Sequence, residues 1–231
     1  MSQPMHFADP TIRIAAAIEG VREVTLAGAA ELAYWRERLR PLGLRPFADS
    51  GSAQLLISAT SARWNGLSFC ELSFAVAVGA GDDEATRGGL LLAHAYNSRR
   101  ALALSERLFF KTPYYHGQLR VELGPPARVE LLEAGAPAFR AAMAGARPAS
   151  WSGDDTWEGA IYLPGAPGQR FYARLSGDTQ VYPFVPGEDT FVIDSAARPA
   201  IFGQLRESGF AASEWRLRAS AAHLKSQTYA R

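Results

Sequence analysis

The stretch LSFCELSFAVAV (67–78) decides the fold, because two sets of residues alternate along its whole length. A period of two is typical of a β-strand, in which successive side chains point to opposite faces of a sheet. The more apolar set, which we expect to face a core, is Ser68, Cys70, Leu72, Phe74, Val76 and Val78. The alternation therefore places Glu71 mid-strand on the opposite face.

The sequence on both sides of this strand predicts many further strands and few helices. Short apolar and β-branched runs separated by Gly and Pro predict strands at 21–27, 54–60, 90–96, 114–123, 127–134, 157–163, 169–176, 179–185, 190–194 and about 213–220. Helical spacing predicts helices at 29–40, from Asn97 or Ser98 to the Thr112-Pro113 terminator, and at 198–207. The second helix should present Ala101, Leu104 and Leu108 on one face, and 137–146 should be a weak helix or a loop.

The order of these elements indicates the fold class. Helices do not alternate regularly with strands, so a parallel sheet built of strand–helix–strand units is not expected. We predict an α+β fold in which a mostly antiparallel curled sheet, barrel-like or cone-like, surrounds a cavity and carries a few helices outside. A sheet of this kind can enclose one small ligand. We expect residues 1–231 to form a single domain, since the length of 231 residues suits one large core.

Composition excludes several classes of partner. With 24 Lys and Arg against 23 Asp and Glu, the formal charge of +1 gives no basic patch for nucleic acid or an anionic membrane. No apolar run approaches the roughly 20 residues of a membrane helix, and the start MSQPMHFADP is polar. The single cysteine, Cys70, excludes an internal disulfide. We expect a cytoplasmic protein that binds neither nucleic acid nor membranes.

Motifs for metals, nucleotides and serine nucleophiles are absent from the sequence. No HExxH, GxGxxG, GxxxxGK[ST] or GxSxG occurs, and the histidines are scattered at positions 6, 94, 116 and 223. We therefore expect no metal and no cofactor. The basic residues are almost all arginine, the two lysines being Lys111 and Lys225. A lysine in such a chain is of interest, because it can lose its proton and act as a nucleophile whereas arginine cannot.

The order of elements over about 36–123 resembles the acetoacetate decarboxylase-like superfamily. It comprises the connector PLGLRPF (41–47), a strand, the strand carrying Glu71, a strand after a Gly-rich turn, and a helix with the pair Glu106-Arg107. It ends in FKTPY (110–114), where the family has an aromatic-Pro-Lys turn. LFFKTPYYHGQLRVE (108–122) is closer to the uncharacterised branch of that superfamily, which has Leu-Pro-Tyr in place of Pro-Lys.

The resemblance implies carbon–carbon lyase chemistry without a cofactor. In the family, a lysine whose pKa is lowered by a neighbouring cation forms an imine with a ketone, and the imine withdraws electrons so that CO₂ can leave. Anchoring the alignment on lysine makes Lys111 this residue. Anchoring on proline places Tyr114 there instead, and we favour this anchor because proline constrains the backbone and lysine does not. By the same resemblance Glu71 orients the substrate.

Two functions from different classes follow. The first is an enzyme or binder for a small oxo- or carboxy-compound in an enclosed cavity, with Lys111 and Glu71 as the catalytic candidates. The expected substrate-binding residues are Glu106, Arg107, Tyr114, His116 and Arg120, with one of the two arginines pairing with an anion. The second is a sensor or carrier that binds a ligand without chemistry. A cavity filled by side chains would instead favour a structural protein. By analogy with the related enzymes, we expect a homo-oligomer.

Overall fold

The computed structural model describes residues 6–133, 135–165, 167–195 and 197–229. The strands are β1 (Ile14–Glu31), β2 (Ala48–Asp49), β3 (Ser52–Trp64), β4 (Leu67–Ala80), β5 (Asp83–Asn97), β6 (Tyr114–His116), β7 (Gln118–Glu122), β8 (Arg128–Glu133), β9 (Ala136–Ala142), β10 (Trp151–Tyr162), β11 (Arg170–Pro183), β12 (Thr190–Ile193) and β13 (Ala211–Ser226). The helices are α1 (Leu32–Leu39), the 3₁₀ turn η1 (Arg40–Leu42), α2 (Arg100–Ser105), the π-turn η2 (Glu106–Phe110) and α3 (Ala200–Glu207).

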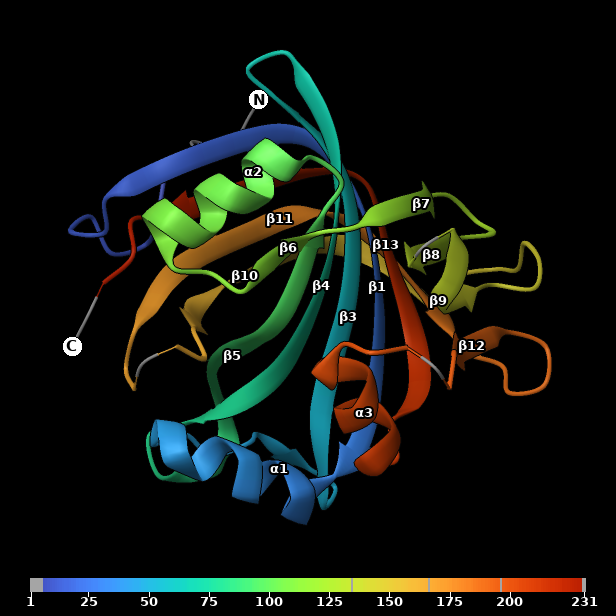
Figure 1. The fold of residues 1–231 in the computed structure, drawn as a ribbon, viewed down its shortest axis with the longest axis horizontal. Coiled ribbons are helices and arrows are strands. Elements are labelled where there is room, and N and C mark those ends of the chain that lie inside the picture. The colour runs from blue at the N-terminus through green and yellow to red at the C-terminus, as the bar shows by residue number, and fades with distance from the viewer. Residues whose placement is uncertain (1–5, 134, 166, 196, 230–231) are drawn as a thin grey trace.

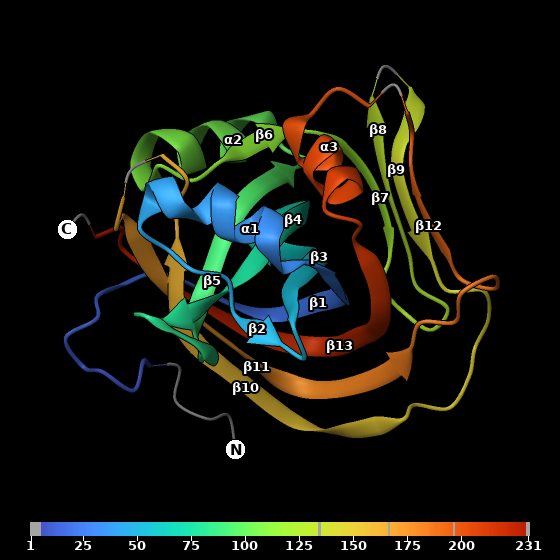
Figure 2. The same ribbon diagram turned by 90° about the horizontal axis from the view of Figure 1, so that it is seen from below.

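The large sheet runs in the order β1-β13-β11-β10-β5-β4-β3-β2, and β1 also pairs with β3. The pairings therefore close into a ring, and Figures 1 and 2 show its strands curling round a common interior. Neighbours in the ring are antiparallel except for the short parallel pairing of β10 with β5, and β6 adds a second parallel pairing outside the ring path. The predicted mostly antiparallel curled sheet with a few helices, an α+β fold, is confirmed.

The two faces of β4 have different surroundings, as the alternation predicts. Leu72, Phe74, Val76 and Val78 are each at most 1% exposed and belong to the main hydrophobic core. Glu71, with its neighbours on the other face, lines the interior of the ring. The prediction that Glu71 lies opposite the apolar set is therefore confirmed.

The main core lies outside the ring, against a second sheet. This sheet has the order β12-β9-β8-β7, and with α1 and α3 it covers the outer face of the ring strands (Figure 2). Phe74 of β4 meets Phe139 of β9 and Phe202 of α3 edge-on, with 5.7 Å between ring centroids in both pairs. Because this outer layer supplies the buried apolar contacts, the interior of the ring does not have to be filled with hydrocarbon.

A bulge in β13 determines which of its residues face the interior. Three steps along β13, from Arg218 to Ala221, match two steps on both β1 and β11. One extra residue reverses the alternation of side chains beyond it. Arg218, before the bulge, has an even number, whereas His223 and Lys225, after it, have odd numbers. All three consequently line the interior. Gly177 of β11 allows the close approach, since a Cβ there would lie 2.6 Å from the carbonyl oxygen of Ser220.

Several predicted elements differ from the structure. Residues 137–146 were expected as a helix or loop, but pairing with β8 and β12 makes 136–142 a strand. The predicted strand 114–123 is two strands in different sheets, and 169–176 with 179–185 is the single strand β11. The last strand extends to Ser226 rather than ending near 220. In each case pairing with a distant strand outweighs the local signal.

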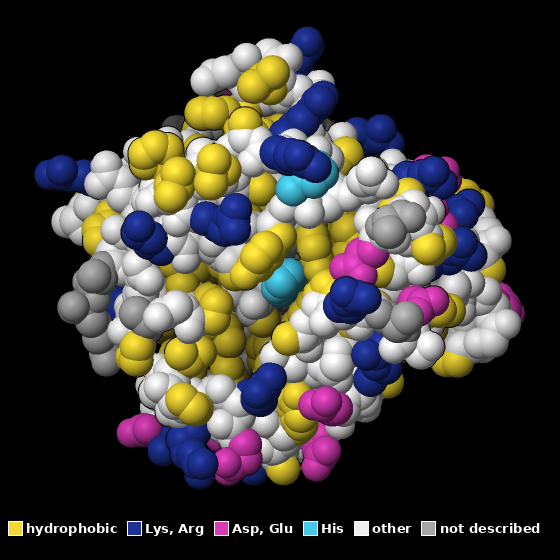
Figure 3. Space-filling view, in the orientation of Figure 1, with side chains coloured by type: hydrophobic (Ala, Val, Ile, Leu, Met, Phe, Trp, Pro, Cys, Tyr) yellow, Lys and Arg dark blue, Asp and Glu magenta, His cyan; other side chains and the backbone are white. Residues whose placement is uncertain are grey.

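The three residues expected on one face of the second helix, Ala101, Leu104 and Leu108, are all exposed. Leu104, Leu108 and Phe109 are 48%, 56% and 75% exposed, whereas Ala103 is buried. Hydrophobic side chains gather over this helix in Figure 3. The π-turn η2 has a different period from an α-helix, so the spacing of three to four residues does not continue beyond Ser105. Asn97 and Ser98 precede the observed N-cap, Arg99, whose side chain makes no capping hydrogen bond.

None of the helices in the described ranges is long and apolar enough to cross a bilayer. A cytoplasmic location and a homo-oligomer stay predictions.

Candidate functional site

A pocket of about 390 Å³ lies inside the ring. All strands of the ring contribute to its walls, together with α2 and η2. Most of the wall is apolar, including Leu90, Leu92, Ile161, Phe171 and Leu175. The size suits a small organic molecule, and apolar walls with a few polar groups are typical of ligand sites. Two clusters of polar groups lie in this pocket, one around Glu71 and one around Glu23, and the side chains of Arg87 and Arg216 also line its wall.

The Glu71 cluster joins three elements of the chain. Asn97 Nδ2 donates a hydrogen bond of 2.9 Å to Glu71 Oε1, and the Tyr114 hydroxyl donates one of 3.1 Å to Oε2. Asn97 Oδ1 in turn accepts the backbone N–H of Arg99 at the start of α2. Tyr114 is brought beside β4 because β6 pairs with β5, opposite Ala95. The carboxyl group of Glu71 is thus held in one orientation.

Burial and a neighbouring charge make Glu71 a weak acid. Burial raises its pKa most, and the nearby Glu106 carboxylate raises it further. The charge of Lys225 and the hydrogen bonds from Tyr114 and Asn97 oppose this rise, and the pKa is raised from 4.5 to about 7. A carboxyl group with this pKa can both donate and accept a proton near neutral pH. Burial and Glu71 also raise the pKa of Tyr114, which keeps its hydroxyl protonated.

Lys225 brings an amine to this cluster from β13. Its Nζ forms an ion pair with Glu106 Oε2, which also accepts a 2.8 Å hydrogen bond from Thr112 Oγ1. The same Nζ lies 4.1 Å from the ring centroid of Phe110 and 4.8 Å from that of Phe171. The side chain is 18% exposed. A lysine at the pocket wall is therefore enclosed by two aromatic rings and a carboxylate.

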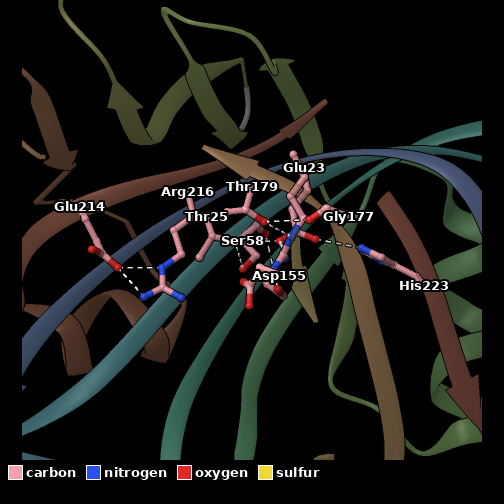
Figure 4. Close-up of polar contacts among 11 residues, drawn as sticks. Glu23, Thr25, Ser58, Asp155, Gly177, Thr179, Glu214, Arg216 and His223 are labelled. Atoms are coloured by element: carbon pink, nitrogen blue, oxygen red, sulfur yellow. Dashed lines mark hydrogen bonds and ion pairs between the residues drawn. The ribbon is translucent and has the colours of Figure 1, made fainter. Parts of the chain in front are cut away.

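The Glu23 cluster lies farther along the same pocket and is drawn in Figure 4. Arg218 bonds Glu23, Asp155 and Thr179 at 3.0, 2.6 and 2.8 Å. His223 Nε2 lies 2.9 Å from Glu23 Oε2. Burial alone would raise the pKa of Glu23, but the hydrogen bond from His223 and the charges of His223 and Arg218 outweigh it and lower the pKa to about 2. Glu23 is therefore a buried carboxylate that stays ionised.

The described residues contain no group of three or more His, Cys, Asp or Glu side chains that could hold a metal ion. The side chains that line the pocket supply an amine, carboxyl groups, an imidazole, guanidinium groups and hydroxyls.

Comparison with solved structures finds matches over nearly the whole chain. The enduracididine biosynthesis enzyme MppR, with HEPES buffer bound, has a TM-score of 0.62 at 13% identity over 92% of this chain and 86% of its own. An acetoacetate decarboxylase-like enzyme from Sphingomonas wittichii RW1 has a TM-score of 0.59 at 14% identity, covering 99% of both chains. The chain has the acetoacetate decarboxylase-like fold. The acetoacetate decarboxylase of Legionella pneumophila matches similarly, with a TM-score of 0.60 at 12% identity over 100% of this chain and 92% of its own. No family model matches the sequence, and no curated protein matches it.

The acetoacetate decarboxylase-like fold brings together three of the predicted site residues. Glu71 and Glu106 line the pocket. Tyr114 is not part of the lining, but its hydroxyl donates a hydrogen bond to Glu71. The other candidates, Lys111, Arg107, His116 and Arg120, are exposed and lie outside the pocket lining.

Lys111 has a left-handed backbone with φ of 59° at the end of η2, directly after the pocket-lining Phe110. Arg107 covers the ring of Tyr115 at 5.5 Å rather than reaching the interior. Arg120 lies on β7, the last strand of the second sheet, and this sheet does not form part of the ring. The left-handed turn at the end of η2 therefore accounts for the outward position of Lys111 alone.

Sequence reasoning missed the residues that β13 contributes. Lys225, His223 and Arg218 lie in a strand that was expected to end near 220, and the bulge hides their common face. The one signal that could have identified Lys225 is composition, because it is one of only two lysines in an arginine-rich chain.

Proposed function

We propose that the pocket binds a small oxo- or carboxy-compound and that Lys225, rather than Lys111, supplies the amine for imine chemistry. The observation that carries this proposal is the Nζ of Lys225 at the pocket wall beside Glu106 and the Glu71 cluster. Lys111 is exposed and lies outside the lining. The amine of this chain thus reaches the interior from the last strand of the ring.

The proposed reaction begins with transfer of a proton from the Lys225 ammonium to Glu106, its ion-pair partner. The neutral amine adds to the carbonyl carbon of the ligand, and loss of one water molecule gives a protonated imine. Glu71, whose pKa is about 7, can deliver the proton that the departing hydroxyl requires. The cationic imine then withdraws electrons from the adjacent carbon.

The walls limit the substrate to a small molecule with an apolar part. A volume of about 390 Å³ with aliphatic and aromatic lining favours a short oxo acid or ketone over a polar sugar. One MppR structure, with a TM-score of 0.62 at 12% identity over 99% of this chain and 97% of its own, holds the condensation product of pyruvate and imidazole 4-carboxaldehyde. That ligand makes pyruvate a suitable first probe.

Borohydride trapping tests the proposal. The protein is incubated with pyruvate, 2-oxobutyrate, acetone and acetoacetate in turn, reduced with borohydride, digested and analysed by mass spectrometry. We expect an adduct on Lys225, its loss in Lys225→Met, and its retention in Lys111→Met. An adduct on Lys111, or none with any of these compounds, would overturn the proposal.

A second candidate function is binding without catalysis. It is favoured by the same contacts, because an ion pair with Glu106 and the faces of Phe110 and Phe171 all stabilise the ammonium form of Lys225. A sensor or carrier would use this cation to bind a ligand carboxylate. Calorimetric binding of pyruvate without a trapped adduct, lost in Lys225→Met, would support this alternative.

A further inference from the structure

His223 and Lys225 project from one face of β13 into the same pocket. They are separated by one residue in a strand, which places their Cα atoms roughly 6 to 7 Å apart. Both side chains line the pocket, and they are 21% and 18% exposed. A group bound at Lys225 Nζ would therefore have the imidazole of His223 as a neighbour along the strand.

Glu23 determines the orientation and the tautomer of His223. The carboxylate of Glu23 is 5% exposed and accepts hydrogen bonds from Arg218 and Thr25 as well as meeting His223 Nε2. A carboxylate that remains ionised can only accept, so Nε2 must carry the proton. The lone pair of a neutral His223 is consequently on Nδ1. Within the described residues Nδ1 has no hydrogen-bonding partner.

The buried ion pair of Arg218 with Glu23 has enough hydrogen-bonding partners without His223. Arg218 already bonds Glu23, Asp155 and Thr179, and its side chain is 7% exposed. A histidine that only completed this network would not need to border the pocket. Figure 4 shows His223 reaching Glu23 from β13, on the opposite side of the carboxylate from Thr179. A carboxylate that positions an imidazole whose other nitrogen is unoccupied is the arrangement of a general base.

We propose that His223, positioned by Glu23, is a general base that removes a proton from the carbon next to an imine carbon formed at Lys225. The inference rests on the proposed imine chemistry and narrows its substrate class. The ligand is an oxo compound with at least one C–H bond on the carbon adjacent to its carbonyl. The site then forms an enamine, a carbon nucleophile that can exchange its proton or add to an aldehyde. Loss of CO₂ alone would not require this base.

The step is redox-neutral and needs no further reactant. The C–H bond breaks, its electron pair forms a carbon–carbon double bond, and the π pair of the imine moves to the nitrogen of Lys225. The proton goes to Nδ1 of His223, and Glu23 stabilises the resulting imidazolium. Exchange of that proton with solvent followed by return to carbon places a solvent hydrogen on the ligand.

Proton exchange in D₂O, followed by ¹H NMR, tests the proposal. The same four oxo compounds are used as probes, and both the borohydride adduct and the exchange rate are measured for each one. We expect His223→Gln to lower the exchange rate by about 10²-fold or more while the yield of the Lys225 adduct stays unchanged. His6→Gln is the matched control, because His6 is exposed and outside the pocket lining, and it should exchange at the wild-type rate.

Glu23→Gln tests the positioning role, since it keeps the shape of the side chain but no longer requires the proton to be on Nε2. We expect the exchange rate to fall, though by no more than in His223→Gln, because a histidine in the wrong tautomer is a poor base, and we expect trapping to be retained. Trapping also reports that the variant pocket is folded, and His223→Asn provides a second substitution if His223→Gln is unstable.

The outcomes separate the two proposals. An adduct without exchange in the wild type, or equal exchange in wild type and His223→Gln, overturns the role of His223 and leaves the imine proposal standing. No adduct and no exchange overturns both.

Discussion

Replacing Glu71 by glutamine removes an ionisable group whose environment favours the neutral acid. The pKa of Glu71 is raised from 4.5 to about 7, chiefly by burial and then by the neighbouring Glu106 carboxylate. Glutamine has nearly the same shape as the protonated acid. Its amide can keep the hydrogen bond from Asn97, and the Tyr114 hydroxyl can rotate to accept instead of donating. The substitution therefore changes the charge behaviour with little change in packing.

The magnitude follows from linkage between protonation and folding. The folded protein retains the proton of Glu71 at pH values where the unfolded chain has lost it, so stability from this group falls as the pH rises from 4.5 through about 7. The difference between the two pKa values corresponds to about 3 kcal/mol. At pH values above the pKa of Glu71 in the folded protein, this loss of stability is constant. At pH values below the pKa of Glu71 in the unfolded chain, the loss disappears.

Urea unfolding of the wild type and Glu71→Gln near pH 4 and near pH 8.5 measures this effect. We expect the free energies of unfolding to be similar near pH 4, and Glu71→Gln to be the more stable protein by about 3 kcal/mol near pH 8.5. Other titrating groups contribute to both proteins and cancel in the comparison. If the stability difference does not change between the two pH values, the reasoning about Glu71 is refuted.

Two further predictions concern the frame that holds the site. Gly177→Ala should lower the free energy of unfolding by about 1 to 3 kcal/mol, because its Cβ would lie 2.6 Å from the Ser220 carbonyl oxygen. Gly145→Ala is the control, since open space surrounds the new Cβ there. Equal chemical-denaturation midpoints for Gly177→Ala and the wild type would contradict the prediction. The pKa of Asp189 would be raised by burial, but hydrogen bonds led by that from Arg147 lower it to about 2. The stability that Asp189 contributes is present above pH 3.8 and is lost as the pH falls through about 2. Asp189→Asn should therefore lose roughly 2 to 3 kcal/mol at pH 7, and urea unfolding that matches the wild type would exclude this role.

Features with a local cause could be predicted from the sequence. The alternation in β4 depends only on the geometry of a strand, so it places Glu71 opposite the apolar set whatever the neighbours of that strand are. The strands on either side of Gly124-Pro125-Pro126, which pair as β7 and β8, follow from two β-rich runs. The absence of regular alternation between helices and strands likewise favoured an antiparallel sheet.

Features that depend on distant segments could not be predicted in this way. Whether 137–146 is a strand depends on β8 and β12, which its own residues do not encode. Whether Lys111 or Lys225 meets the pocket depends on a π-turn and a bulge, each of which changes the local period of the side chains.

The sequence by itself determined that a strand carries Glu71 on its less apolar face, and that the chain possesses just two lysines from which an imine could be made. Only the tertiary structure decided which lysine meets Glu106, because that ion pair joins residues 119 positions apart and exists only once β13 closes the ring. The physical reason is that side-chain direction follows from local backbone geometry, whereas proximity across a closed sheet follows from the pairing of every strand in it.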